Sequence, residues 1–250
     1  IASLDLLSKH RPVSHMVHQG HMLSVGFGIV LVTVAAIDIL FGKHLPIIKQ
    51  LNSIDPLSLA FVGIYLIAMK LIYSYEKTRV KEFTGEVAEA TQPGATLKSA
   101  TIWFILYSIM IVIAACYLPE LGEKIAKSTG WGESFIGTSL IAITTSLPEI
   151  SVSVTARLGA FDMAVANLLG SNLFNIAILA AIDFCYIKAP LLRSVSDVNV
   201  LPALTAVIAM GIIVIGLTYR SERKLLFLAG DALAILLVYI TANVLLFSIH

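Results

Sequence analysis

The sequence contains few charged residues and only two cysteines. Asp, Glu, Lys and Arg make up 13% of its 250 residues, with a formal net charge of +1, whereas soluble domains carry about 25% charged residues. This balance gives no sign of a nucleic-acid partner or a polyanionic substrate. Cys116 and Cys185 each lie inside an apolar run, so the sequence supports neither a disulfide framework nor a CxxC metal site.

Apolar residues are abundant instead. Hydrophobic residues make up 58% of the chain and the mean hydropathy is +0.90, which is more than one globular core can bury. Long apolar segments, each near the roughly 20 residues that a membrane-spanning helix needs, predict an all-α, multi-pass membrane protein. The seven segments are 22–41, 57–75, 100–118, 134–157, 162–186, 200–218 and 225–248.

One long polar stretch, residues 76–99, separates these segments into two groups. It mixes both signs of charge and is closed by Pro93-Gly94, so we expect a solvated connector between two membrane halves. Lysines and arginines in the loops number ten on the side of this connector and six on the opposite side. The excess of positive charge indicates that the connector is cytoplasmic and that the C-terminus faces outward.

Two parts of the chain align without a gap, residues 1–23 and 179–201. The identical pairs are Asp5 with Asp183, Pro12 with Pro190, Val17 with Val195 and Leu23 with Leu201. Such an internal repeat is typical of transporters. It predicts that 1–75 form the last two spans of a first half and that 100–250 form a complete five-span second half. The first-half helices that correspond to the remaining spans of the second half would lie before Ile1, and the sequence does not begin with a methionine. We therefore interpret it as part of a longer protein.

The segment 134–186 carries polar residues where a membrane helix is expected to be apolar. Pro148 has no amide hydrogen, so the carbonyl of Thr144 loses its helical partner, and the ring is expected to free nearby carbonyls such as that of Ala142. Glu149 follows directly and lies near the middle of its span. An ionised group there costs roughly 3 kcal/mol, so a bound cation would stabilise both the carboxylate and the open carbonyls.

Oxygen-bearing side chains recur at helical spacing around this break. Ala142, Thr145 or Ser146, Glu149 and Ser153 share one face of the first helix, and Asn167, Ser171 and Asn175 share one face of the second, with Asn172 beside them. Gly170 is expected to let the two helices approach closely. Carboxylate, hydroxyl, amide and carbonyl oxygens are the ligands that Ca²⁺ and Na⁺ prefer, so we expect a site for a hard cation.

The paired motifs "TSLPE" at 145–149 and "NLLGSNLFN" at 167–175 resemble the second alpha-repeat of the calcium/cation antiporter superfamily, the sodium/calcium exchanger membrane region. The resemblance implies a helical bundle of inverted five-helix repeats, of which this chain has about seven spans and lacks the first alpha-repeat. It also implies exchange of Ca²⁺ for Na⁺ or H⁺ by alternating access, without a cofactor. The implied partners are the lipid bilayer, the transported cations and the first-half helices, and the short connector favours the plasma membrane of a prokaryote.

The resemblance also assigns roles to residues at the matching positions. Glu149 would be the principal cation ligand, and two positions depart from the family pattern, because Thr144 replaces a glycine and Asn175 replaces an aspartate found in some members. The other ligands implied are the Ala142 carbonyl and the side chains of Thr145, Ser146, Ser171 and Asn175, with Asn167, Asn172, Pro148 and Gly170 in support.

Other functions remain open at this stage. A channel would use Glu149 in a selectivity ring, which several chains usually build by symmetry. An intramembrane enzyme would use Ser146 and Glu149 as nucleophile and base, but no GxSxG motif occurs and all histidines lie outside the spans. His15, His18 and His21 are interpreted as an interfacial basic patch, and Lys70 as a side chain reaching the membrane surface.

Overall fold

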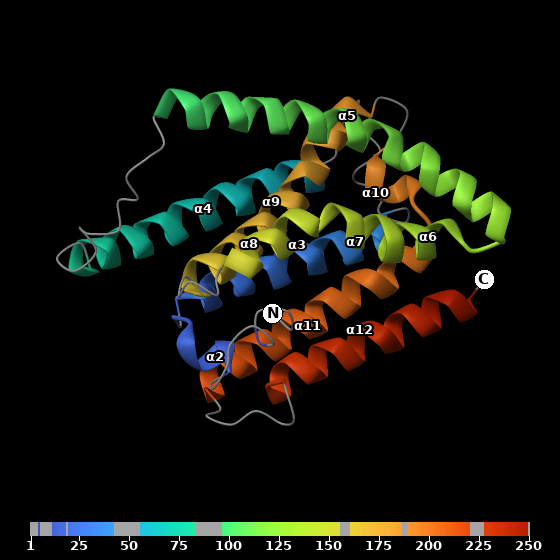
Figure 1. Cartoon of the computed structure of the whole chain (residues 1–250). Coiled ribbons are helices and arrows are strands. Elements are labelled where there is room, and N and C mark those ends of the chain that lie inside the picture. Colours follow the sequence, from blue (N-terminus) through green and yellow to red (C-terminus); the bar gives the residue numbers. More distant parts are fainter. Residues whose placement is uncertain are drawn as a thin grey trace.

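The computed structural model describes residues 5, 12–18, 20–42, 56–83, 97–155, 161–186, 190–220 and 228–249, and every regular element in these ranges is a helix (Figure 1). Five helices in them are long and apolar enough to cross a membrane: His21–Phe41, Leu97–Thr129, Ala164–Cys185, Asp197–Tyr219 and Gly230–Ser248. The prediction of an all-α membrane protein is therefore confirmed. The count of seven spans stays a prediction.

Most long helices begin and end close to the predicted bounds, but two of them extend further. The long helices are α3 (His21–Phe41), α4 (Pro56–Phe83), α5 (Leu97–Thr129), α9 (Phe161–Cys185), α11 (Val200–Tyr219) and α12 (Gly230–Ser248). α4 continues to Phe83, into the stretch expected to be a connector, because Glu, Lys and Arg are good helix formers. α5 continues through Pro119 to Thr129, where Lys124 pairs with Glu120 and Lys127 with Glu123 one turn earlier.

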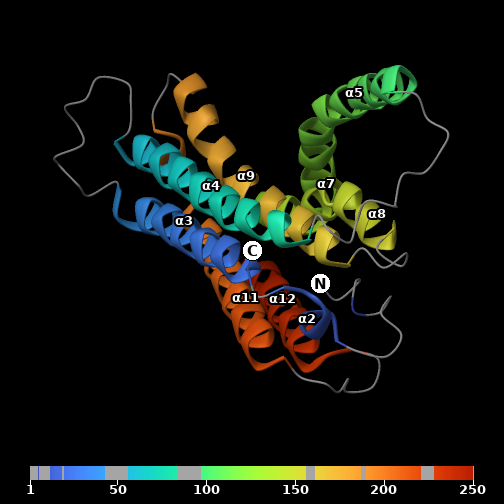
Figure 2. The same ribbon diagram turned by 90° about the vertical axis from the view of Figure 1, so that its left-hand side faces the viewer.

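The centre of the bundle is an antiparallel pair formed by α3 and α11. Near the start of α3, the Met22 sulfur accepts a hydrogen bond of 3.5 Å from the hydroxyl of Thr218 at the end of α11. At the opposite end of the pair, Ala36 and Ile39 pack against Val200 at the start of α11. α9 and α4 cover other faces of α3, and α12 lies along α11 (Figures 1 and 2).

Two short helices, α2 (Val13–Met16) and α10 (Leu191–Ser194), lie at opposite ends of this pair. In α2, Val13 packs into a buried cluster with Leu217 at the end of α11. In α10, Leu192 packs against the cluster at the start of α11. Each short helix follows a proline with extended backbone, Pro12 (φ −55°, ψ 144°) or Pro190 (φ −54°, ψ 127°).

Each of the two short helices is fixed by an equivalent contact with an aspartate carboxylate. Asp5 accepts a hydrogen bond of 3.0 Å from the amide of Val13, and Asp183 accepts one from the amide of Leu191. Both aspartates are buried, and both contact the first residue of the short helix, eight positions further along the chain. This shared geometry agrees with the alignment of residues 1–23 with 179–201. The predicted boundaries of the two halves remain predictions.

A buried ion pair joins α10 to α3. Arg193 Nε lies 3.5 Å from Asp38 Oδ1, and the Asp38 side chain is 1% exposed. Gly42 passes so close that a Cβ there would overlap the Asp38 carboxylate. α10 is therefore fixed to the end of α3 by charge as well as by packing.

Candidate ion-binding site

The predicted span 134–157 is a helix broken near its middle. It consists of α6 (Glu133–Ile136), the π-helical turn η3 (Gly137–Ile141), α7 (Ala142–Thr145) and α8 (Leu147–Thr155). Ser146 separates α7 from α8 with φ −90° and ψ 1°. α8 restarts at Leu147, which places Pro148 in a first turn, where its missing amide hydrogen breaks no intrahelical bond. The helix is thus interrupted at Ser146, two residues before the proline, and the role of Pro148 in opening it stays a prediction.

The Ala142 carbonyl differs from its prediction. It accepts hydrogen bonds from the Ser146 amide at 3.1 Å and from the Thr145 hydroxyl at 3.1 Å, whereas the sequence predicted that Pro148 would free it. The reason is that the helix stays intact through Thr145, so the disruption falls one turn later. A carbonyl has two lone pairs, and Ala142 keeps its place at the wall of a cavity described below.

Two of the predicted hydroxyl ligands already donate their hydrogens within their own helices. Thr145 Oγ1 also lies 3.0 Å from the carbonyl oxygen of Ile141, and Ser171 Oγ donates to the carbonyl of Leu168 at 3.0 Å. A hydroxyl has one hydrogen and two lone pairs. Donation to the backbone therefore orients each oxygen and leaves lone pairs for a cation.

Glu149 is turned inward at the break. Among the neighbouring residues 142–151, only its side chain is half-buried and all others are exposed, including Thr145 and Ser146. One carboxylate oxygen of Glu149 is fully covered by protein. Because α8 packs against α9, the carboxylate lies beside the helix that carries the amide-bearing face.

The polar face of α9 is intact and largely open. α9 is continuous from Phe161 to Cys185, so Asn167, Ser171 and Asn175 share one face, as the spacing predicted. The three asparagines, including Asn172, are exposed and Ser171 is half-buried. Gly170 is exposed too, and a Cβ there would meet no atom within 4 Å. The expected close approach of helices at Gly170 is therefore not seen within the described residues, since this glycine faces the open side.

A cavity that the sequence did not predict adjoins the helix break. It measures about 590 Å³ and lies between η3, α7, α9, α11 and α12. Its oxygen-bearing lining side chains are Thr138, Asn172, Thr205, Tyr239 and Asn243. Ser139 in the π-helical turn donates a hydrogen bond to Asn243 Oδ1 across the helix interface. The sequence offered one indication of this cavity, the polar residue Asn243 in a mostly apolar segment.

The predicted ligand set contains one carboxylate and several neutral oxygens. Within the described ranges, no three His, Cys, Asp or Glu side chains converge as a metal-binding group. The side chain of Ser153 and the turn around Gly159 lie outside the described residues. Hydroxyl, amide and carboxylate oxygens match the preference of Ca²⁺ and Na⁺, and a single carboxylate supplies one of the charges that Ca²⁺ needs.

Comparison with known proteins agrees with this chemistry. Residues 99–248 match the family described as sodium/calcium exchanger protein. Over 184 residues the chain is 28% identical to a candidate antiporter, CaxA, of Alkalimonas amylolytica, covering 68% of this chain and 57% of that protein. It is 31% identical over 153 residues to inner membrane protein YrbG of Escherichia coli, covering 60% of this chain and 45% of YrbG.

The name of a third relative includes sodium and calcium. The sodium/calcium exchanger MaX1 of Methanosarcina acetivorans is 39% identical over 80 residues, which cover 32% of this chain and 23% of MaX1. No solved structure matches the chain. The chain spans about half the length of CaxA and YrbG. Since the family match covers more than half of the chain and includes both polar motifs, the chain belongs to the sodium/calcium exchanger family of membrane transporters.

Proposed function

We propose that the chain carries one ion-binding helix pair of an antiporter that exchanges Ca²⁺ for Na⁺ or H⁺ across the plasma membrane of a prokaryote, with the connector in the cytoplasm. The observation that carries the proposal is the position of Glu149. Its carboxylate is turned inward directly after a helix break in an apolar segment, on a helix that packs against α9. A carboxylate at that depth is costly unless a cation or proton offsets its charge.

Competition for this carboxylate would couple the two ion fluxes. Ca²⁺ prefers six to eight oxygen ligands, and Glu149 with Thr145, Ser146, Ser171 and Asn175 offers one charged group among them. We propose that a second helix pair, in the same protein or in another polypeptide, adds a second carboxylate. Ca²⁺ would then neutralise both carboxylates together, whereas Na⁺ or H⁺ neutralises them one at a time, so the ions exchange instead of leaking.

The exposure of the polar face supports a second helix pair. Thr145, Ser146, Asn167 and Asn175 are exposed, although they lie on segments predicted to cross the bilayer. Backbone and side-chain oxygens facing hydrocarbon are strongly unfavourable. Covering by further helices with matching polar groups would remove this cost and complete the coordination of the ion.

Alternating access is the mechanism we propose for the whole protein. The cavity of about 590 Å³ reaches Ala142 and Asn172 from the side of α11 and α12, opposite in the bundle to α5, which contacts α6 and η3. A broken helix can change the angle between its two parts with few lost hydrogen bonds. Movement at Ser146 would therefore expose Glu149 to one membrane surface at a time.

Uptake of radioactive Ca²⁺ into sealed vesicles containing the protein at its native length tests the proposal. An imposed Na⁺ gradient is compared with an imposed proton gradient, and vesicles without the protein serve as control. Uptake driven by Na⁺ identifies a sodium/calcium exchanger, and uptake driven only by protons identifies a calcium/proton antiporter. Absence of Ca²⁺ uptake with both gradients, in vesicles shown to contain inserted protein, contradicts the proposed function.

A further inference from the structure

A second feature lies away from the ion site, where α2 meets the first turn of α12. The carboxylate of Asp5 is fully buried and accepts hydrogen bonds from two backbone amides, those of Val13 and Ala229. Val13 is the first residue of α2, and Ala229 immediately precedes α12. Asp5 therefore ties the turn that leads into α3 to the beginning of the last helix.

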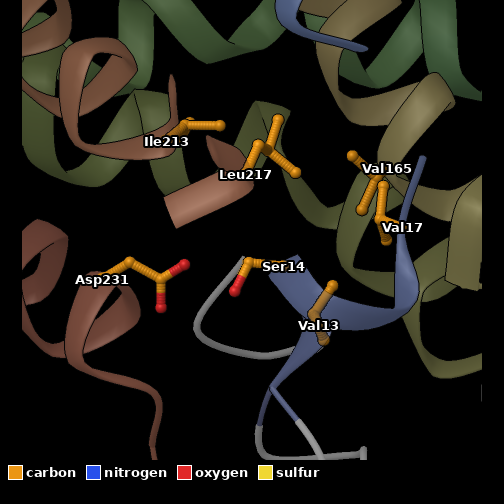
Figure 3. Close-up of a pocket in the computed structure, with 7 residues that line it drawn as sticks. All are labelled: Val13, Ser14, Val17, Val165, Ile213, Leu217 and Asp231. Carbon is orange, nitrogen blue, oxygen red and sulfur yellow. The ribbon is translucent and has the colours of Figure 1, made fainter. Parts of the chain in front are cut away.

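A small cavity adjoins this contact. It measures about 10 Å³ and is lined by residues of α2, α9, α11 and α12 and by Val17. The residues around it are Val13, Ser14, Val17, Val165, Ile213, Leu217 and Asp231 (Figure 3). By the same measure, one water molecule needs roughly 10–15 Å³. The cavity thus matches the size of a single water.

Two polar side chains face each other across this space. Ser14 is 6% exposed, and no hydrogen-bond partner of its hydroxyl lies within the part of the chain that the structure describes. Figure 3 shows the Ser14 hydroxyl and the Asp231 carboxylate directed toward one another. Asp231 Oδ1 accepts the amide of Ala232 at 2.9 Å. A buried hydroxyl is costly when it makes no hydrogen bond, so the arrangement calls for a bridging group.

The lining determines what that group is. Every other side chain around the cavity is Val, Ile or Leu, so Ser14 and Asp231 are its only oxygen-bearing side chains among the residues described. Ca²⁺ requires six to eight oxygens, which this cavity does not offer. A water molecule requires two to four polar partners, and it can accept a hydrogen from Ser14 while donating one to Asp231.

We propose that one buried water bridges the Ser14 hydroxyl and the Asp231 carboxylate. Together with the direct contacts of Asp5, this water fixes α2 to the first turn of α12, so that the segment before α3 and the last described helix are held as one unit. The inference rests on the cavity and its two polar groups and is independent of the ion that the protein transports.

An experimental structure at a resolution that shows ordered water tests the proposal directly. Density is expected within hydrogen-bond distance of both Ser14 Oγ and the Asp231 carboxylate, and the variant Ser14→Ala is expected to lose it. Absence of density where other internal waters are visible contradicts the proposal, as does a direct hydrogen bond between the two side chains. Density surrounded by several oxygens at roughly 2.3–2.6 Å would indicate a cation and would also overturn it.

A double-mutant cycle provides a second test in solution. Thermal unfolding midpoints are measured for Ser14→Ala, Asp231→Ala and the double variant in detergent. The shift of the double variant should be smaller than the sum of the single shifts, because either change already removes the bridge. Ser248→Ala combined with Asp231→Ala is the control, since the Ser248 hydroxyl donates to its own helix at Val244, and its shifts should add. Additive shifts for Ser14 and Asp231 would overturn the proposal.

Discussion

At the scale of the residue, Gly216 allows the backbone of α11 to touch the Asp231 carboxylate in α12. A Cβ built at Gly216 would overlap that carboxylate, whereas one built at Gly211, five residues earlier in the same helix, would meet no atom within 4 Å. Since α11 contacts α12 along its length, this single close approach helps to set the separation of the two helices.

We predict that Gly216→Ala destabilises the fold by about 1–3 kcal/mol, the usual cost of overpacking. Gly211→Ala should be neutral or stabilise by up to about 1 kcal/mol, because alanine has the higher helix propensity. Thermal unfolding in detergent measures both variants. Equal stability of the two variants would show that the approach at Gly216 is looser than described.

The two threonines at the helix break provide a second comparison between residues. Thr144 Oγ1 donates to the carbonyl of Leu140 at 2.8 Å, and Thr145 Oγ1 shares its hydrogen between the carbonyls of Ile141 at 3.0 Å and Ala142 at 3.1 Å, so both hydroxyls bond within their own helix. Of the two, only Thr145 is predicted from its spacing of four residues to face the same way as Glu149. A functional difference between them would therefore reflect the cation and not the helix.

We predict that Thr145→Val weakens the apparent affinity for Ca²⁺ by up to about tenfold, since one neutral oxygen contact is comparable to a hydrogen bond of about 1 kcal/mol. Thr144→Val should change the affinity little. The Ca²⁺ concentration for half-maximal uptake into vesicles distinguishes the two variants. A larger effect at Thr144 would place the ion on a different face of the helix.

At the scale of the element, the sequence predicted the regular parts of the site better than the irregular ones. Pro148 indicated a break because its missing amide and its ring act locally, and the spacing of Asn167, Ser171 and Asn175 needed only a continuous helix. The π-helical turn at Gly137–Ile141 left no local signal, since an extra residue in a helical turn depends on neighbours such as Asn243 in α12. The prediction that the Ala142 carbonyl lacks a hydrogen bond was wrong, because the break falls at Ser146.

Helix ends were also hard to predict from hydropathy. Apolar windows located the segments within α4 and α5, but charged residues continue both helices beyond them. The pairs Glu120–Lys124 and Glu123–Lys127 support the end of α5, and a window that scores apolarity treats them as loop. Aligning Asp5 with Asp183, by contrast, correctly drew attention to two residues that make equivalent contacts.

The short helix α10 depends on one such contact. We predict that Asp183→Ala destabilises the fold by about 1–3 kcal/mol, because the amide of Leu191 loses its acceptor in a buried position. Asp183→Asn should restore much of this loss, since an amide oxygen still accepts a hydrogen bond. Thermal unfolding in detergent measures both. If the alanine and asparagine variants were equally unstable, the charge would matter more than the hydrogen bond.

At the scale of the whole molecule, the described bundle is well packed on one side and open on the other. Among the five candidate spans in the described residues, α3 is the most buried, with half of its apolar window inside the protein, whereas no residue in the corresponding window of α5 is buried. Figure 2 shows α5 projecting away from the packed helices. Thr145, Ser146, Asn167 and Asn175, which were predicted to belong to the ion site, are exposed as well. The proposed second helix pair would cover this surface and its polar oxygens.

The account as a whole depends on the charge of Glu149. Its matched control is Glu133, an exposed glutamate in the first turn of α6, outside the helix break. Replacing either residue with glutamine removes one negative charge and keeps the size of the side chain. The two variants therefore differ only in where the charge is lost.

The most direct measurement compares gradient-driven Ca²⁺ uptake by Glu149→Gln and Glu133→Gln at equal amounts of inserted protein. We predict that Glu149→Gln lowers uptake at least about a hundredfold, as expected when an ion loses a charged ligand worth about 3 kcal/mol, and that Glu133→Gln keeps it close to the unmodified rate. Full uptake by Glu149→Gln would contradict the assignment of this carboxylate as the ion ligand.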